Sequence, residues 1–400
     1  MPTESRFARL RFVTILGLLS AFGPFSVDLY LPALPDLTAD LDTSASLGQL
    51  TLTASIAGLG LGQLVAGPLS DRFGRRPPLL VGLACYVLLS LACAAAPTIW
   101  ALIVLRLLQG FAGSAGLVVA RAIVRDVHAG VEAAHLYSIL IIIAGVAPIV
   151  APLVGGQLLF LTDWRGLFVV LALIATLVLA AAGLGLRETL PRARRSDRGL
   201  REIGVTLALV SRDRAFVTYA LTLGFAFAEM FAYIAGSPFV LEDIHGISPQ
   251  AFSLVFATNA VGLMLASQLN RALVRRVELH RLLGIAVGVG AVAGVALLVV
   301  VLLDGGLVAL VPCMFFAVGS LGMIIPNATA LAITPFPHVA GSASALLGAS
   351  QFMLGAVTAP LVGAFGRETA VPMAVVMATC GLLAAALFAS SPRLPQPAAG

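Results

Sequence analysis

Long apolar runs, each close to twenty residues, alternate along this chain with short polar segments. A helix rises about 1.5 Å per residue, so about 20 residues cross the hydrocarbon of a bilayer. The pattern therefore predicts an all-α integral membrane protein with twelve transmembrane helices. The expected spans lie near 12–34, 47–69, 77–96, 99–120, 134–160, 166–186, 215–240, 250–270, 281–303, 306–328, 339–363 and 369–390.

Charge adds an orientation to this pattern. Only 11% of the residues are charged, and all 24 positive side chains are arginines. Only Arg106, Arg165 and Arg367 lie outside the polar segments that precede the first run or follow the even-numbered ones. Because cationic loops stay in the cytoplasm, we expect a multi-pass protein of the bacterial inner membrane with both termini cytoplasmic. Anionic membrane lipids, and no nucleic acid, are the expected partners of these arginines.

The two halves of the chain repeat each other. The segment 67–76, after the second run, has a counterpart at 267–276, after the eighth, and both end in Arg-Arg. Ala-Pro-Leu-Val-Gly occurs at 151–155 and again at 359–363. Coincidence in a chain of low complexity is the alternative, but both echoes preserve the order of the spans. Duplicated six-helix halves are typical of transporters. We therefore expect bundles at 1–186 and 215–400, joined by a cytoplasmic linker at 187–214.

The polar segment after the second run reads Gly-Pro-Leu-Ser-Asp-Arg-Phe-Gly-Arg-Arg. It resembles the loop 2–3 signature of the major facilitator superfamily. By this resemblance Asp71 contacts the start of helix 11, near Val339, and an arginine after helix 4, and so holds a cytoplasmic gate closed. The second copy has Arg271 in place of the acid, so the gate is assigned to the first copy. The gate residues are Gly67, Asp71, Arg72, Gly74, Arg75, Arg76, Arg121 and Arg125.

Further segments are similar to the drug:proton antiporter branch of that superfamily. Arg106-Leu-Leu-Gln-Gly resembles its helix 4 motif, and Asp28-Leu-Tyr-Leu-Pro resembles the helix 1 signature of the Bcr/CflA subfamily. This resemblance implies two pseudo-symmetric six-helix bundles (the major facilitator fold), alternating access, and efflux of amphiphilic drugs by a monomer that needs no cofactor beyond the proton gradient. The residues that match the antiporter motif of helix 5 are Gly145, Pro148, Pro152, Gly155 and Gly156.

Three ionisable residues fall inside the spans, where a charge costs at least about 2.5–3.5 kcal/mol on insertion scales. Asp28 and Arg106 have the same depth in helices 1 and 4, which permits an ion pair between them. Glu229 lies close to the midplane of helix 7. We expect Asp28 and Glu229 to be protonatable carboxylates that face a central cavity. A static Asp28–Arg106 pair is the alternative, and Glu229 is open to three roles: binding a cationic substrate, carrying protons, or bordering water.

The absence of lysine excludes one rival function. A P-loop needs a lysine, so this chain cannot itself be a conventional ATP-driven pump. The energy source is then an ion gradient, and the protein is a secondary active transporter rather than an enzyme. No metal-binding motif is visible. The alternative function is a proton-coupled sugar or amino-acid transporter of the same fold, against which the helix 5 motif argues.

Overall fold

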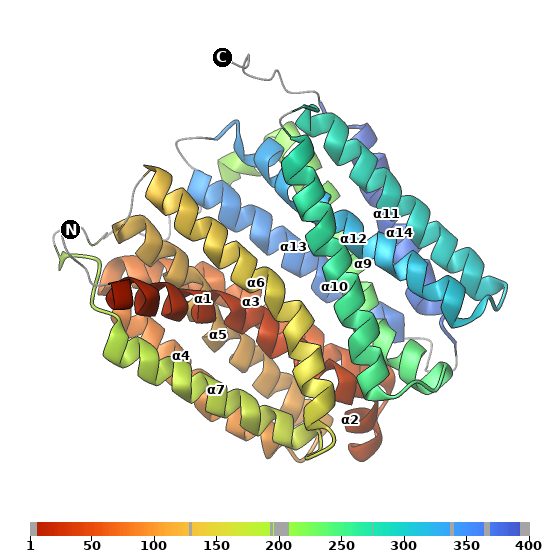
Figure 1. Cartoon of the computed structure of the whole chain (residues 1–400), viewed down its shortest axis with the longest axis horizontal. Helices are drawn as coiled ribbons and strands as arrows, with labels where there is room; N and C mark the ends of the chain where they lie inside the picture. Colours follow the sequence, from red (N-terminus) through yellow and green to blue (C-terminus); the bar gives the residue numbers. More distant parts are fainter. Residues whose placement is uncertain are drawn as a thin grey trace. The chain divides into compact units, whose positions relative to one another are not determined.

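The computed structural model describes residues 6–127, 130–192, 195, 208–274, 276–336, 340–363 and 369–392. All regular structure in these ranges is helical, and Figure 1 follows the helices in chain order by colour. The long helices of the first half are α1 (Arg6–Asp28), α3 (Ala45–Phe73), α4 (Arg76–Ala94), α5 (Ile99–Val127), α6 (Gly130–Leu158) and α7 (Trp164–Gly185). Those of the second half are α9 (Arg214–Pro238), α10 (Pro249–Leu273), α11 (Leu279–Leu302), α12 (Gly306–Ile333), α13 (Ala340–Gly363) and α14 (Val371–Ala389).

Each of the twelve expected spans overlaps one of these helices. Ten of the described helices are long and apolar enough to cross a membrane. The bent pair Arg11–Gly23 and Phe25–Asp40, which covers most of α1 and the short helix α2 (Leu34–Asp40), makes eleven when it is taken as one span. In α6 the described apolar segment, Ile149–Leu158, is shorter. The multi-pass, all-α fold predicted from the apolar runs is therefore confirmed.

The first span is broken rather than continuous over 12–34. α1 ends at Asp28, and a turn leads into a 3₁₀ segment, η1 (Leu31–Ala33), and then into α2. The segments Arg11–Gly23 and Phe25–Asp40 of this span meet at an angle of 45°. Asp28 consequently lies at the end of a helix and not in the middle of one.

Proline explains where the chain can start new helical turns after this break. Pro32 and Pro35 both occupy first-turn positions, in η1 and α2 respectively. A proline there loses no hydrogen bond, because the first N–H groups of a helix have no partner within it. Proline also disfavours helical geometry in the residue that precedes it. The expected span, 12–34, ran through Pro32 and stopped just before Pro35, whereas the structure shows that α1 already ends at Asp28.

The same close helix crossing occurs once in each half. A Cβ atom at Gly110, on α5, would overlap the backbone oxygen of Ser55 on α3. In the second half, a Cβ atom at Gly322, on α12, would overlap the backbone oxygen of Leu263 on α10. Small residues let membrane helices approach through their backbones, which is where the packing energy of such helices comes from. This correspondence supports the internal repeat inferred from the sequence.

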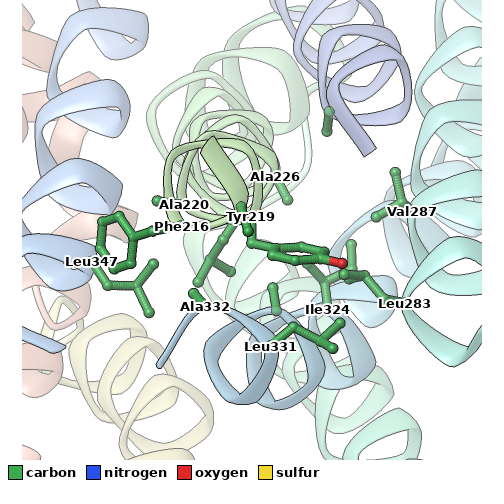
Figure 2. Packing of buried hydrophobic residues seen from close by; sticks show 14 of the residues in the cluster. Phe216, Tyr219, Ala220, Ala226, Leu283, Val287, Ile324, Leu331, Ala332 and Leu347 are labelled. Carbon is green, nitrogen blue, oxygen red and sulfur yellow. The ribbon is translucent and has the colours of Figure 1, made fainter. Parts of the chain in front are cut away.

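Each half has its own apolar core. In the second half, side chains from α9, α11, α12 and α13 converge, as Figure 2 shows around the ring of Phe216 and that of Tyr219. The Tyr219 hydroxyl donates a hydrogen bond of 2.8 Å to the backbone oxygen of Pro392, so the one polar atom of this ring is satisfied. Buried tyrosine usually requires such a partner. The core thus ties the C-terminal segment to α9.

The chain divides into two compact units, which depart from the expected boundaries in one place. The first unit comprises Met1–Arg198 and Ile247–Ala257, and the second comprises Gly199–Gly246 and Thr258–Gly400. The division at 198 falls within the expected linker, 187–214. The start of α10 belongs to the first unit because it packs on α6, where the Gln250 side chain donates a hydrogen bond of 2.9 Å to the Gly156 carbonyl.

Candidate functional site

Asp28 is a buried carboxylate at the break in the first span, and the residue is only 5% exposed. Within the described part of the chain, it has neither a hydrogen-bond partner nor an ion-pair partner for its carboxylate. Gly155 of the helix 5 motif supports this break, because a Cβ atom there would overlap the carbonyl oxygen of Leu29, the next residue. The helix 5 motif therefore contacts the chain directly beside Asp28.

Arg106, on α5, is completely buried and lies on aromatic rings. Its guanidinium carbon is 4.4 Å from the centre of the Tyr30 ring and 5.5 Å from that of Phe168. Nη1 donates a hydrogen bond of 2.6 Å to Oε1 of Gln109, whereas Nε and Nη2 have no hydrogen-bond acceptor among the described residues. Arginine stays charged in proteins. The first unit thus encloses a positive charge that π-faces and one amide compensate only in part.

The expected ion pair between Asp28 and Arg106 is not formed. No carboxylate of the described residues comes within 4.0 Å of Arg106, and Tyr30 supplies the ring on which it stacks. The physical reason is the break after Asp28, which turns the chain and presents Tyr30, two residues later, to α5. Equal depth in the membrane was a sound argument for helices 1 and 4 as neighbours, but it could not fix the side chain that faces the arginine.

Glu229, on α9, is enclosed by helices of its own unit. The residue is 2% exposed, and its Oε1 has no hydrogen-bond partner among the described residues. Its carboxylate faces glycines of α11 and α14: Cβ atoms built at Gly290, Gly294 and Gly381 would lie 3.5, 3.1 and 3.3 Å from its nearer oxygen. These contacts do not support the expectation that the carboxylate faces a central cavity.

A third polar cluster lies in the segment that follows α3, where the gate was expected. Arg75 has a side chain that is only 3% exposed. Its Nε and Nη2 donate hydrogen bonds of 2.7 and 3.2 Å to the two oxygens of Asp126, at the end of α5. Its Nη1 donates to Asp71, at 2.5 Å, and to the Ser70 hydroxyl, at 2.9 Å. One guanidinium therefore connects the end of α3 with the end of α5.

Glu188 completes this cluster from the segment after α7. Its carboxylate accepts hydrogen bonds from the backbone N–H groups of Arg75, at 2.8 Å, and Arg76, at 3.2 Å. These groups begin α4, where the helix dipole favours a negative charge. Burial raises the pKa of the Glu188 carboxyl, and the backbone amides of Leu190, Arg75 and Arg76 more than offset this, so the pKa lies below its ordinary value. Thr189 also donates to Asp126.

Sequence reasoning omitted Asp126 and Glu188 from the gate residues. A signal existed for both, since each is an acidic residue next to an arginine in the polar segment that follows an even-numbered apolar run. Gly74 was among the expected gate residues. It has a φ of 95° at the turn from α3 to α4, and this left-handed geometry suits a glycine.

The remaining gate residues are peripheral to the Arg75 cluster. Arg125 approaches Asp71 at 4.0 Å through a mostly exposed side chain, and Arg76 donates to the Gly183 carbonyl. Arg72 stacks on the neighbouring Phe73 ring, and Arg121 is exposed. Gly67 has room for a Cβ atom. The expected contact of Asp71 with helix 11 near Val339 lies outside the described residues.

The helix 5 motif lies on α6. Pro152, Gly155 and Gly156 are buried, and Gly156 faces the start of α10 through Ser253. The surroundings of Gly145 and Pro148 fall outside what the structure describes. The two described glycines therefore serve close approach, as the small-residue rule for membrane helices predicts.

These observations define a class of protein. The sequence repeats a six-helix pattern, the helices span a membrane, and charged groups are buried inside each unit without full compensation, which in membrane proteins marks transport pathways. The fold and the site are those of a secondary transporter, not of an enzyme. The chain belongs to the Major Facilitator Superfamily, whose family model matches residues 16–360.

Comparison with individual proteins agrees with this assignment. The chain is 42% identical over 95% of both lengths to an uncharacterized MFS-type transporter, YdgK, of Bacillus subtilis. It is 32% identical to a bicyclomycin resistance protein homolog of Haemophilus influenzae, over 92% of this chain and 93% of that one. It is 31% identical to a chloramphenicol resistance protein of Pseudomonas aeruginosa, over 94% and 89%. These relatives agree with the resemblance to Bcr/CflA-type antiporters.

A solved structure shares the fold. The crystal structure of a D-xylose-proton symporter superposes with a TM-score of 0.76 over 96% of this chain and 97% of that one, at 17% identity. At this level of identity the likeness establishes the fold alone.

Proposed function

We propose that this protein exports antibiotics and other amphiphilic drug-like compounds across the bacterial inner membrane in exchange for protons, by alternating access. The observation that supports proton coupling is the presence of two buried ionisable groups in the first unit, Asp28 and Arg106, which form no ion pair with any described residue. The names of the relatives, which are resistance proteins against bicyclomycin and chloramphenicol, support drug export. The likeness to a sugar symporter is one of fold and favours no importer.

Asp28 is the proposed coupling carboxylate. An ionised Asp28 is attracted to the uncompensated charge of Arg106, and the attraction is strong where the dielectric is low. A protonated Asp28 is not attracted, and Arg106 then stacks on Tyr30 as the structure shows. Proton occupancy of Asp28 therefore changes the force between the break after α1 and α5. A conformational equilibrium can shift only through such a difference in interaction between two states.

The decisive experiment uses Asp28→Asn in proteoliposomes. Asparagine keeps the shape of the side chain and cannot ionise, so drug-driven proton movement should be lost while folding and insertion are preserved. Asp36→Asn is the matched control, because Asp36 is an exposed carboxylate only eight residues later, on α2. A pH-sensitive dye inside the vesicles measures the exchange. Normal drug/proton exchange in Asp28→Asn would remove this residue from the mechanism.

The Arg75 cluster is the proposed gate. It joins α3, α5 and the segment after α7 within one unit, and Asp71 is its half-exposed member, with 44% of the side chain accessible. The hydrogen bonds of Arg75 hold the Asp71 carboxylate in place. An exposed carboxylate held in this way can contact another part of the protein in one conformation and water in the other. We propose that Asp71 stabilises the conformation that is closed to the cytoplasm.

The remaining assignments concern the setting of the transporter. The arginines of the loops that follow the even-numbered spans support cytoplasmic termini and contact with anionic lipids. The bacterial relatives support an inner-membrane location. We propose that the protein works as a monomer, since each unit of the chain contains its own buried charges. Native mass spectrometry in a mild detergent checks the oligomeric state, and a dominant dimer would contradict it.

A further inference from the structure

Three glycines line the niche that Glu229 occupies. Gly290 and Gly294 lie one helical turn apart on α11, and Gly381 lies on α14. At each of the three positions an added Cβ atom would come within 3.1–3.5 Å of a Glu229 oxygen, and at Gly294 and Gly381 it would also come within 3.2 Å of the backbone of the neighbouring helix. The α9, α11 and α14 helices are thus packed as closely around the carboxyl group as their backbones allow.

No cationic side chain of the described residues accompanies this carboxyl group. Among the described residues of α9, α11, α12 and α14, the positively chargeable side chains are Arg214, His280 and Arg281, all at one end of the unit. Arg214 precedes Glu229 by fifteen residues, or about 22 Å of helix. Cys380, directly before Gly381 on α14, is a buried titratable residue beside the niche. An ionised Glu229 would therefore be an isolated negative charge inside a helix bundle, whereas a protonated one is neutral.

One polar side chain lies beside the niche. A Cβ atom at Gly290 would be 2.9 Å from the Ser320 hydroxyl oxygen, on α12, and 3.5 Å from Oε2 of Glu229. The Ser320 hydroxyl donates a hydrogen bond of 2.7 Å to the Ala317 carbonyl and keeps its lone pairs for a further donor. The carboxyl group and this hydroxyl thus face the same glycine from two sides.

We propose that Glu229 is a proton-binding site of the second unit, separate from Asp28 and never in contact with the drug. The carboxylic acid keeps its proton while α11 and α14 are packed against it. When these helices move apart and water enters the niche, the O–H bond breaks, the proton passes to water and the carboxylate remains. The proposal rests on proton coupling as the function of the protein and gives Glu229 a role in it.

The glycines exclude the alternative of a substrate contact in this conformation. A drug is far larger than a methyl group, and even a methyl group on Gly294 would press on both Oε1 and the Met377 carbonyl. Cationic and neutral drugs should consequently depend on Glu229 to the same degree. This outcome differs from the selective loss of cationic drugs that a substrate-binding carboxylate would show.

Infrared difference spectroscopy on proteoliposomes tests the site directly. Spectra recorded between low and high pH, and on addition of a drug, should contain a carboxylic acid band that disappears in Glu229→Gln and persists in Asp28→Asn. Gly294→Ala should shift this band, because the new methyl group lies against Oε1. Gly288→Ala, on the same helix, is the matched control and should leave the band unchanged, since no atom beyond its own helical turn lies within 4 Å of its Cβ position.

The outcomes separate this inference from the proposed function. If the wild-type vesicles show no drug-driven proton movement, the coupled function fails whatever the infrared spectra contain. If exchange is normal and no band assigned to Glu229 responds to pH or to drug, Glu229 is a permanently protonated packing residue and the inference is overturned. A loss in Glu229→Gln that is confined to cationic drugs would also overturn it, in favour of substrate binding.

Discussion

Removal of Asp126 should destabilise the first unit, because it leaves a buried arginine without its main partner. The Asp126→Ala change deletes both oxygens that Arg75 holds through Nε and Nη2. At 3% exposure, the Arg75 side chain has no access to replacement water. The arginines that set the topology of the chain are untouched, so insertion into the membrane should be normal.

The expected loss follows from the geometry of the pair. Breaking a buried ion pair by removing one partner costs about 3–5 kcal/mol. Asp71 and Ser70 still accept hydrogen bonds from Nη1 of Arg75, so the charge keeps part of its compensation. The loss should therefore lie near the lower limit, at about 3 kcal/mol. Replacement of both partners, in Arg75→Met with Asp126→Leu, should restore much of this stability because no charge is then left buried.

Equilibrium unfolding in mixed micelles of a mild detergent and sodium dodecyl sulfate provides the measurement. Cys93 and Cys380 are buried, so a thiol-reactive fluorescent dye reports the opening of each unit once the more accessible Cys85 and Cys313 are replaced by serine. Asp40→Ala is the control, because the side chains of Arg165 and Asp40 are 35% and 49% exposed and ion pairs that water can reach contribute little. Equal losses for Asp126→Ala and Asp40→Ala would refute the argument from burial.

Two further predictions concern the same cluster. The pKa of Glu188 lies below its ordinary value of 4.5. The ionised carboxylate should therefore stabilise the folded protein above pH 4.5, and this stabilisation should be lost as the pH falls through the lowered pKa. The unfolding midpoints of wild type and Glu188→Gln should accordingly differ at pH 7 and converge in acid, and a constant difference would argue against the assignment. Asp71→Ala should lower the turnover of transport and leave equilibrium drug binding unchanged. The distance between spin labels on α3 and α13 should shift toward that of the inward-open state. Identical distance distributions in the mutant and wild type at every pH would exclude Asp71 from the gate.

The spans were predictable because membrane insertion is read from local composition. Each helix needs about twenty apolar residues in succession, and this requirement is visible without any knowledge of the fold. The break after Asp28 was not predicted, although Pro32 and Pro35 are visible in the sequence. Membrane helices often tolerate proline, because neighbouring groups satisfy the freed backbone. Whether a given proline bends or ends a helix therefore depends on its surroundings.

The partners of the buried charges could not be predicted in the same way. Arg75 and Asp126 are 51 residues apart, and Arg106, on α5, meets Tyr30, in the turn after α1. Rotation of a helix about its axis decides such contacts, and a soluble helix reveals its rotation through a polar face. α9 is apolar on nearly all sides, so the depth of Glu229 could be predicted from the sequence but not the direction in which its carboxylate points.

Gly155 shows how a family motif and a charged site depend on each other physically. The turn after Asp28 can approach α6 only because the residue opposite Leu29 has no side chain. A larger residue would push this turn away from α6, together with Tyr30, whose ring covers Arg106. The helix 5 motif thus fixes the position of the break in the first span, and the break in turn keeps Asp28 apart from Arg106. The motif associated with antiporters therefore acts on the proposed proton site through backbone packing, without contributing a polar group of its own.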